Sequence, residues 1–157
     1  MVLCPGSRSA PLAIAVGELS RLGLINLITA IDERSAGFLA LGLSTGNGKA
    51  AAVITTSGSA VANLLPSAVE ADKSCQPLLF LTADRPLRLK NCGANQTVNQ
   101  EDFLTCSCRH FLHGPLEGMH LSSEQSLNKL VEIAWNKLHD FPGPVHLNLP
   151  FEEPLYP

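Results

Sequence analysis

Residues 50–65 read AAAVITTSGSAVANLL, and this stretch decides the fold. A short apolar run, Ala50–Thr55, is followed directly by the small polar residues Thr56–Ser59 and then by apolar residues at helical spacing. A continuous apolar run of this length is typical of a strand buried on both faces of a parallel sheet. The stretch therefore predicts a strand, a tight polar turn and a helix, and Pro66 is expected to bend that helix.

The same pattern recurs along the chain. The predicted strands are Val2–Cys4, Leu27–Ile31, Ala50–Thr55, Pro77–Thr82 and Pro144–Leu149. The segments with helical periodicity are Pro11–Leu22, Glu33–Leu43, the stretch that begins near Gly58, and a last helix that follows a capping-box pair, Ser122 and Gln125. Strands that alternate with helices predict an α/β fold, here a three-layer α/β/α arrangement with a mostly parallel central sheet.

Some details of this prediction can be tested against a structure. The apolar helix faces are expected to include Leu39, Val69 and Val131, which recur at helical spacing with their neighbours. The segment Asn91–Gly118 is polar and mixed, and we expect a loop-rich stretch with one short strand around Arg109–Leu112.

Composition narrows the class of protein. The 157 residues suit one domain, and 45% hydrophobic with 16% charged residues is a globular composition. A formal net charge of −3 without a basic run disfavours nucleic acid as a partner, and no apolar stretch is long enough to span a membrane. The five cysteines are expected to be free thiols in a reducing cytoplasm. Cys106 and Cys108 near His110 match no common zinc spacing, so we expect them to be buried apolar residues.

Polar loops follow four of the predicted strands. They begin at Pro5, Asp32, Thr56 and Ala83, and in a parallel sheet such loops meet at the end where the strands finish, which is where ligands bind. Each loop also has a structural explanation. Serines and Asp32 can cap helices, Glu33 suits the positive end of a helix dipole, and Arg85 could sit in a surface turn. Ser57–Ser59 could cradle a phosphate, although the spacing of a dinucleotide-binding or P-loop motif is missing.

Seven segments, in order, resemble one enzyme family. They are Pro5–Leu12, Asp32–Arg34, Thr56–Leu64, Leu81–Pro86, Cys92–Gln96, Gly143–Asn148 and Glu153–Tyr156. They are spread from residue 5 to residue 156, and essentially the whole chain resembles the N-terminal, pyrimidine-binding domain of the SEPHCHC synthase family (2-succinyl-5-enolpyruvyl-6-hydroxy-3-cyclohexene-1-carboxylate synthases). Members of that family usually have Thr where this chain has Ser59, a change that keeps the hydroxyl.

The resemblance implies roles for particular residues. Glu33 corresponds to the catalytic glutamate, whose carboxyl hydrogen-bonds the pyrimidine ring of the cofactor. The residues implied on the substrate side are Ser7, Arg8, Arg85 and Gln96. The residues implied near the pyrimidine, besides Glu33, are Ser57, Gly58, Ser59 and Asn95. Arginines suit this site because both substrates of the family are dicarboxylates, and a guanidinium pairs with a carboxylate through two hydrogen bonds.

The resemblance also implies a reaction and its partners. The family uses thiamine diphosphate with Mg²⁺ or Mn²⁺. It is a family of transferases that decarboxylate 2-oxoglutarate and add the remaining four-carbon unit to isochorismate, in menaquinone or phylloquinone synthesis. The full enzyme is expected to be a homo-oligomer, a dimer or a dimer of dimers, in the cytoplasm or, in a plant-type pathway, in the plastid. Gly37 and Gly42 would permit close helix packing, either between subunits or within the chain.

One expected motif does not occur in the sequence. The family binds the diphosphate and the metal through Gly-Asp-Gly followed by Asn, and no Gly-Asp-Gly is present, so we predict no metal ligand here. Residues 1–157 are therefore expected to be the pyrimidine-binding domain of a longer enzyme, inactive without the middle and diphosphate-binding domains. A subunit of another split thiamine-diphosphate enzyme and a non-catalytic binding module remain alternatives. The pattern alone also admits an unrelated nucleotide-binding domain.

Overall fold

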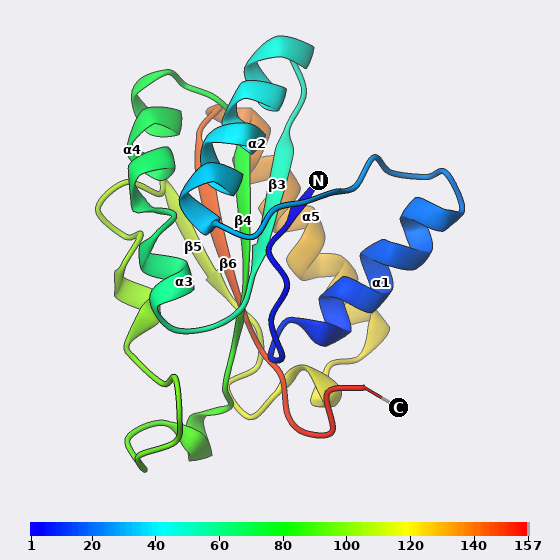
Figure 1. Ribbon diagram of the computed structural model, residues 1–157, viewed down its shortest axis with the longest axis vertical. Helices are drawn as coiled ribbons and strands as arrows, with labels where there is room; N and C mark the ends of the chain where they lie inside the picture. The colour runs from blue at the N-terminus through cyan, green and yellow to red at the C-terminus, as the bar shows by residue number, and fades with distance from the viewer. Residues whose placement is uncertain (157) are drawn as a thin grey trace.

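A parallel sheet lies at the centre of the computed structural model, which describes residues 1–156 (Figure 1). Its strands are β1 (Val2–Leu3), β2 (Ile28–Thr29), β3 (Ala51–Thr55), β4 (Leu78–Asp84), β5 (His110–His113) and β6 (Pro144–Pro150). They lie in the order β2-β1-β3-β4-β6-β5, and every neighbouring pair is parallel. The carboxyl ends of all strands therefore lie at the same end of the sheet, which is the lower end in Figure 1.

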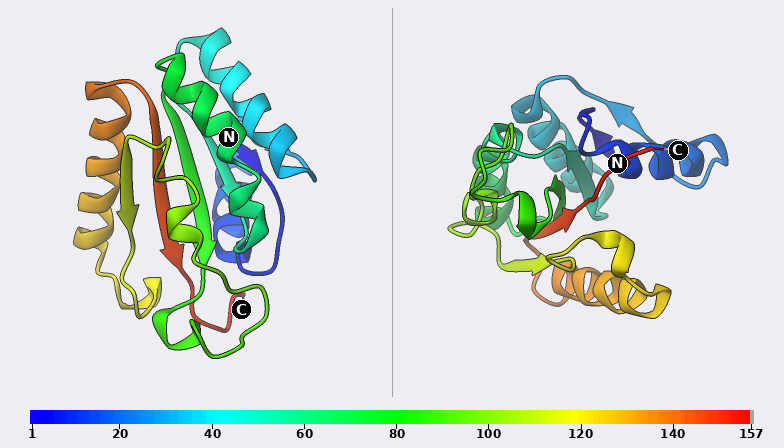
Figure 2. Two further views of the ribbon diagram at one scale, coloured as in Figure 1. Left: turned by 90° about the vertical axis from the view of Figure 1, so that its left-hand side faces the viewer. Right: turned by 90° about the horizontal axis from the view of Figure 1, so that it is seen from below.

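Helices cover both faces of the sheet. One face carries α1 (Ala10–Arg21) and α5 (Glu124–Asp140), and the other carries α2 (Glu33–Asn47), α3 (Ser59–Ala62) and α4 (Leu65–Lys73) (Figure 2). Short 3-10 turns, η1 (Leu87–Leu89), η2 (Gln100–Asp102) and η3 (Met119–Leu121), lie in the connections. The predicted three-layer α/β/α fold with a parallel sheet is confirmed.

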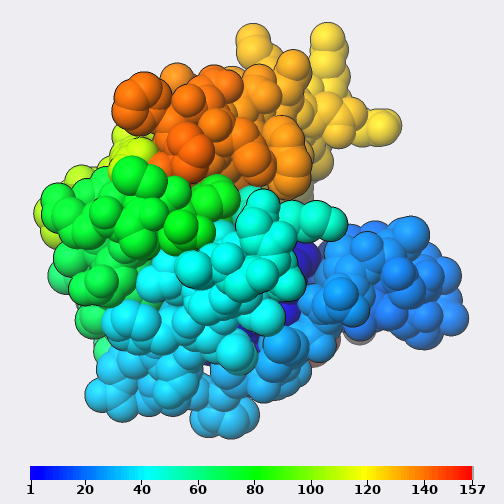
Figure 3. Space-filling view, turned by 90° about the horizontal axis from the view of Figure 1, so that it is seen from above, coloured from blue at the N-terminus to red at the C-terminus, as the bar shows by residue number. Residues whose placement is uncertain are grey.

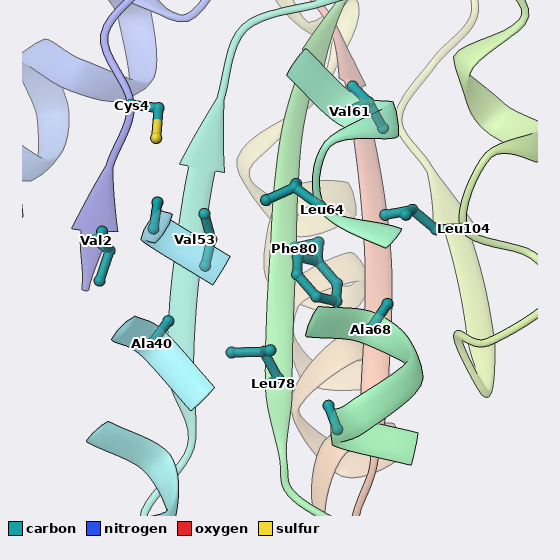
Figure 4. Packing of buried hydrophobic residues seen from close by; sticks show 12 residues of the cluster. Val2, Cys4, Ala40, Val53, Val61, Leu64, Ala68, Leu78, Phe80 and Leu104 are labelled. Atoms are coloured by element: carbon teal, nitrogen blue, oxygen red, sulfur yellow. The ribbon is translucent and has the colours of Figure 1, made fainter. Parts of the chain in front are cut away.

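The main core lies between the sheet and the α2–α4 layer (Figure 4). Leu78 and Phe80 of β4 are fully buried there, and alanines of the helices, such as Ala40 and Ala68, pack against them. The small side chains allow the helix backbones to approach the sheet and each other closely. A Cβ added at Gly37 of α2 would lie 2.2 Å from Ser67 Oγ of α4, so Gly37 serves packing within this chain.

Of the two outer strands, β2 is shorter and more exposed than the sequence predicts, whereas β5 has the predicted length. The segment Leu27–Ile31 was predicted to be buried on both faces, but β2 has only two residues and both are exposed. β2 lies at the sheet edge and pairs only with the two-residue β1, so little of its surface is covered. The predicted short strand at Arg109–Leu112 is confirmed as β5, one residue further along, at the opposite edge.

Several helix details also differ from the prediction. The N-cap of α5 is Ser123, which accepts from the backbone N–H of Ser126, and not the predicted Ser122. The predicted single helix is interrupted at residues 63–64, which separate α3 from α4. Pro66 lies in the first turn of α4, where its missing N–H costs no hydrogen bond. Leu39, Val69 and Val131 point outward, with Val131 59% exposed, because sheet contacts reach only part of each apolar stripe.

The amino ends of the strands enclose a separate hollow. It has a volume of ≈ 590 Å³ and is lined by Met1, Leu24, Asn47 and Ala50 among others (Figure 3). It lies at the end of the sheet opposite to the predicted site. Within residues 1–156, no helix combines the length and the apolar character that a membrane crossing requires.

Candidate functional site

The hydrogen bonds of one arginine connect the loops at the carboxyl ends of β3 and β4. Arg85, which directly follows β4, donates from Nη1 to Ser57 Oγ at 2.6 Å and to the carbonyl oxygen of Gln96 at 2.8 Å. Gln96 in turn donates from Nε2 to the carbonyl oxygen of Ser57 at 2.7 Å. Three residues that the sequence predicted for the site are therefore in direct contact, although they come from separate loops.

Arg8 lies in the loop after β1 and is almost fully buried. Its Nη1 donates to the carbonyl oxygen of Phe151 at 3.0 Å, and its Nη2 donates to Glu153 Oε1 at 2.9 Å. Its Nε is buried and has no hydrogen-bond partner among the described residues. Ser7, the neighbouring predicted residue, lines a separate small hollow with Glu153 and Tyr156.

The arginines line a cationic pocket. A cavity of ≈ 370 Å³ is bordered by Arg8, Arg85, Arg88 and Asn95, together with the carboxylate of Glu153. Burial lowers the pKa of Arg85, and the nearby positive charge of Arg8 lowers it further. Two guanidinium groups are thus close enough to repel each other, and an anionic ligand would relieve that repulsion.

Arg88 was missed in the sequence, yet it borders the same pocket. It stands on η1, three residues after Arg85, and is paired through two hydrogen bonds of 2.8 and 2.7 Å with the carboxylate of Glu152. A second arginine only three residues after the predicted Arg85 was a signal in the sequence that could have identified it.

Glu33 occupies the first position of α2 and is partly exposed. Asp32 caps the helix by accepting from the backbone N–H of Ser35 at 3.0 Å. The ion pair with Arg34, reinforced by that backbone bond, lowers the pKa of Asp32 well below its usual range. The carboxylate of Glu33 accepts from Nδ2 of Asn63 at 3.3 Å, a contact that joins α2 to the α3–α4 junction.

Cys4 lies at the end of β1, near Glu33. Burial, followed by the negative charges of Glu33 and Asp32, raises the pKa of the Cys4 thiol to about 11. The thiol therefore stays neutral near pH 7. All five cysteines are free, but Cys106 is exposed, which corrects the expectation that it is buried. Cys108 does pack against the main core, where burial raises its pKa to about 12.

The turn Ser57–Ser59 needs its glycine. Gly58 has φ +86°, and a Cβ there would lie 2.7 Å from Cγ of Gln96. The backbone N–H of Gly58 donates to Oε1 of Gln100 at 2.9 Å. This N–H is therefore already engaged inside the protein, which argues against the phosphate cradle that the sequence left open.

A buried polar network, which no sequence pattern indicates, lies behind this turn. Gln100 is fully buried and donates to the carbonyl oxygen of Ala83 at 3.0 Å and to Oδ1 of Asn148 at 2.8 Å. Asn148 donates to Oδ2 of Asp84 at 2.8 Å, and the hydroxyl of Thr82 donates to Oδ1 of Asn148 at 2.7 Å. The network thus connects the ends of β4 and β6 to the Gly58 turn.

Three members of the same region have the geometry of a metal site. The ligand atoms of Asp84, Glu101 and His113 lie within 4.8 Å of one another. The ammonium group of Lys90, however, is bonded to both Asp84 and Glu101. Burial opposes the charge on Lys90, but the two carboxylates outweigh it and raise its pKa. The positive charge that this cluster needs is supplied by Lys90.

Comparison with known proteins gives two findings. Residues 1–106 match the family model described as "Thiamine pyrophosphate enzyme, N-terminal TPP binding domain". The chain is also similar to proteins named 2-succinyl-5-enolpyruvyl-6-hydroxy-3-cyclohexene-1-carboxylate synthase. It is 67% identical over 156 residues to the one from Prochlorococcus marinus (strain MIT 9303) and 68% identical over 157 residues to the one from Synechococcus sp. (strain CC9311). These matches cover 99% and 100% of this chain but 27% of each relative, so the chain spans about a quarter of their length.

Proposed function

The chain belongs to the family of N-terminal TPP-binding domains of thiamine pyrophosphate enzymes, and from this membership we propose that it is the pyrimidine-binding domain of a SEPHCHC synthase. In that role it contributes Glu33 to the cofactor and the arginine pocket to the substrates. The reaction is the decarboxylation of 2-oxoglutarate and the transfer of the remaining four-carbon unit to isochorismate, for menaquinone or phylloquinone synthesis.

The observation that carries this proposal is the cationic pocket. Arg8, Arg85 and Arg88 border one cavity at the carboxyl end of the sheet, where ligands of parallel sheets bind. Each arginine can pair with a carboxylate through two hydrogen bonds, and 2-oxoglutarate and isochorismate each carry two carboxylates.

The residues present fit the pyrimidine half of the cofactor. Glu33 is partly exposed at a helix start, and among the described residues its Oε2 accepts only from Asn63 at 3.3 Å, so the carboxyl can still make a hydrogen bond to a ring nitrogen. When bound, thiamine diphosphate supplies the electron sink for loss of CO₂ from a 2-oxo acid. Glu33 would orient the pyrimidine and hold a proton at its ring nitrogen.

The residues of this chain do not fit the diphosphate or its metal. No Gly-Asp-Gly occurs in the sequence, and Lys90 holds the space within the Asp84–Glu101–His113 cluster. We therefore assign the diphosphate and the Mg²⁺ or Mn²⁺ to residues outside this chain. A homo-oligomeric enzyme is supported by the exposed apolar side chains of Phe38 and Leu39 on α2 and of Val69 on α4.

The test is turnover by an enzyme that joins this chain to the domains it lacks. With thiamine diphosphate, Mg²⁺, 2-oxoglutarate and isochorismate, the assembled enzyme should form product, and the chain alone should form none. Glu33→Gln should reduce kcat by about a hundredfold or more, as loss of a general acid–base group does. Near-normal turnover by Glu33→Gln would contradict the assignment of Glu33, and a lack of turnover by the assembled wild type would contradict the proposed function.

A further inference from the structure

Asn63 is the side chain that contacts Glu33 across the α2–α4 layer. Its Nδ2 donates to Oε2 of Glu33 at 3.3 Å, over a separation of 30 positions in the chain. An amide N–H that donates to a carboxylate stabilises the ionised form and restricts the rotation of the carboxyl group.

The backbone around Asn63 is firmly held. Its own N–H donates to the carbonyl oxygen of Ser59 at 3.1 Å, and the N–H of Leu64 donates to that of Val61 at 3.0 Å. Leu64 is fully buried in the main core. The close approach of Gly37 to Ser67 fixes α2 against α4 just beyond this contact. Asn63 therefore presents its amide to Glu33 from a rigid support.

The other described polar groups near Glu33 do not donate a hydrogen bond to its carboxylate. On its own helix, Asp32 and Arg34 are engaged with each other through a 2.6 Å ion pair. From β1, Cys4 is a neutral thiol near pH 7, because burial and the carboxylates raise its pKa to about 11. Asn63 is thus a neutral donor whose amide cannot titrate in competition with Glu33.

We propose that Asn63 is the positioning residue of Glu33, which orients its carboxyl group. The structural part of this inference concerns two residues of this chain. Its catalytic consequence rests on the proposed function, because it applies only if Glu33 serves the cofactor. Asn63 acts through Glu33 and need not touch the substrate.

A titration of the chain itself tests the structural part. In the 157-residue protein with ¹³C-labelled glutamate, the carboxyl signal of Glu33 is the one that Glu33→Gln removes. Asn63→Asp keeps the shape of the side chain but places a negative charge beside Glu33. In this variant the titration midpoint of Glu33 should move up by about one pH unit or more, as expected of two neighbouring carboxylates.

Two further variants make this result decisive. Asn128→Asp adds the same charge on the exposed side of α5 and should leave the Glu33 midpoint unchanged. Asn63→Ala removes only the donor and should change the position or width of the Glu33 carboxyl signal, and it decides the question if Asn63→Asp does not fold. An unchanged Glu33 midpoint in folded Asn63→Asp, or an unchanged Glu33 signal in folded Asn63→Ala, would overturn the inference.

Activity then tests the catalytic part in the assembled enzyme. Asn63→Ala should lower kcat roughly tenfold, which corresponds to one hydrogen bond to a charged group, with little change in KM for 2-oxoglutarate. Asn63→Asp should move the acidic limb of the pH profile to higher pH. An unchanged kcat and limb beside an inactive Glu33→Gln would refute the role of Asn63 alone, whereas an active Glu33→Gln would refute the proposed function instead.

Discussion

The arginine pocket and the polar network behind it are neighbours with opposite designs. In the pocket, Arg8 and Arg88 are held by Glu153 and Glu152, and the Nε of Arg8 has no partner among the described residues. In the network, Gln100 and Asn148 are fully buried and each makes several hydrogen bonds, and the one ring nitrogen of the buried His146 that has no partner among the described residues is Nδ1. Spare donors suit a region that receives a ligand, whereas satisfied groups suit one that must not move.

We expect the polar network to contribute to folding stability and the arginine pocket to contribute to ligand binding. Changes in the network should cost folding stability, because each leaves buried polar atoms without partners. Changes in the pocket should alter ligand affinity with little effect on folding. The Gly58 turn joins the two regions, since its N–H bonds Gln100 and its Cα faces Gln96.

The largest effect is expected at Asp84, which is almost fully buried in the network. Its carboxylate accepts from Lys90, Asn148 and the backbone N–H of Arg85. Asp84→Ala should lower the free energy of unfolding by about 3–5 kcal/mol, because it leaves two donors without their partner and removes one of the two carboxylates that neutralise the buried ammonium of Lys90. Urea unfolding measures this loss.

A matched control lies on the surface. Glu18 pairs with Arg21 on the exposed side of α1, and Glu18→Ala should leave the urea midpoint unchanged within error. A loss at Asp84 no larger than that at Glu18 would show that the network does not carry stability.

The two regions also differ in how well sequence could predict them. The buried runs of β3 and β4 are continuous and apolar, so the strands and the edge at which Arg8, Ser57 and Arg85 meet could be predicted. The network could not, because Gln100 lies in a segment without periodicity and its partners Ala83 and Asn148 are 17 and 48 positions away. The exposed β2 was misjudged because apolar composition does not reveal which strand lies at the edge.

Acid should weaken the network through His146. This residue is fully buried beside Thr82, and burial lowers its pKa to about 4 from an ordinary value near 6.5. The unfolded chain therefore binds a proton more readily than the folded chain. The contribution of neutral His146 to the free energy of unfolding is fully present above pH 6.5 and is lost as the pH drops toward 4. Below pH 4 this residue causes no further change. The total loss is up to about 3 kcal/mol.

The slope of unfolding free energy against pH, between pH 6.5 and 4.5, measures this effect. His146→Gln cannot titrate and should flatten the slope, whereas the same change at the exposed His139 should leave it as in the wild type. Equal slopes in wild type and His146→Gln would mean that His146 does not control the acid response.

A smaller loss is expected at the junction between the regions. Gly58→Ala must hold an alanine at φ +86° with its Cβ 2.7 Å from Cγ of Gln96, so we expect a loss of about 2 kcal/mol. Gly46→Ala provides the contrast, since Gly46 lies in α2 with no atom within 4 Å of an added Cβ. That variant should gain up to about 1 kcal/mol in thermal or urea unfolding. A harmless Gly58→Ala would mean that the turn is not fixed by its glycine.

The smallest effect on folding should come from the pocket, at Glu153. Its side chain is 65% exposed, and its carboxylate occupies Nη2 of the buried Arg8. Glu153→Gln should leave the urea midpoint nearly unchanged, since an exposed partner contributes little. It should strengthen binding of 2-oxoglutarate to the assembled enzyme by about threefold, because the guanidinium no longer has to release a competing carboxylate. Calorimetric titration measures the affinity, with Glu132→Gln on α5 as the charge-matched control. Weaker binding by Glu153→Gln than by Glu132→Gln would mean that Glu153 organises the pocket instead of competing for it, and the contrast between an open pocket and a closed network would then fail on the pocket side.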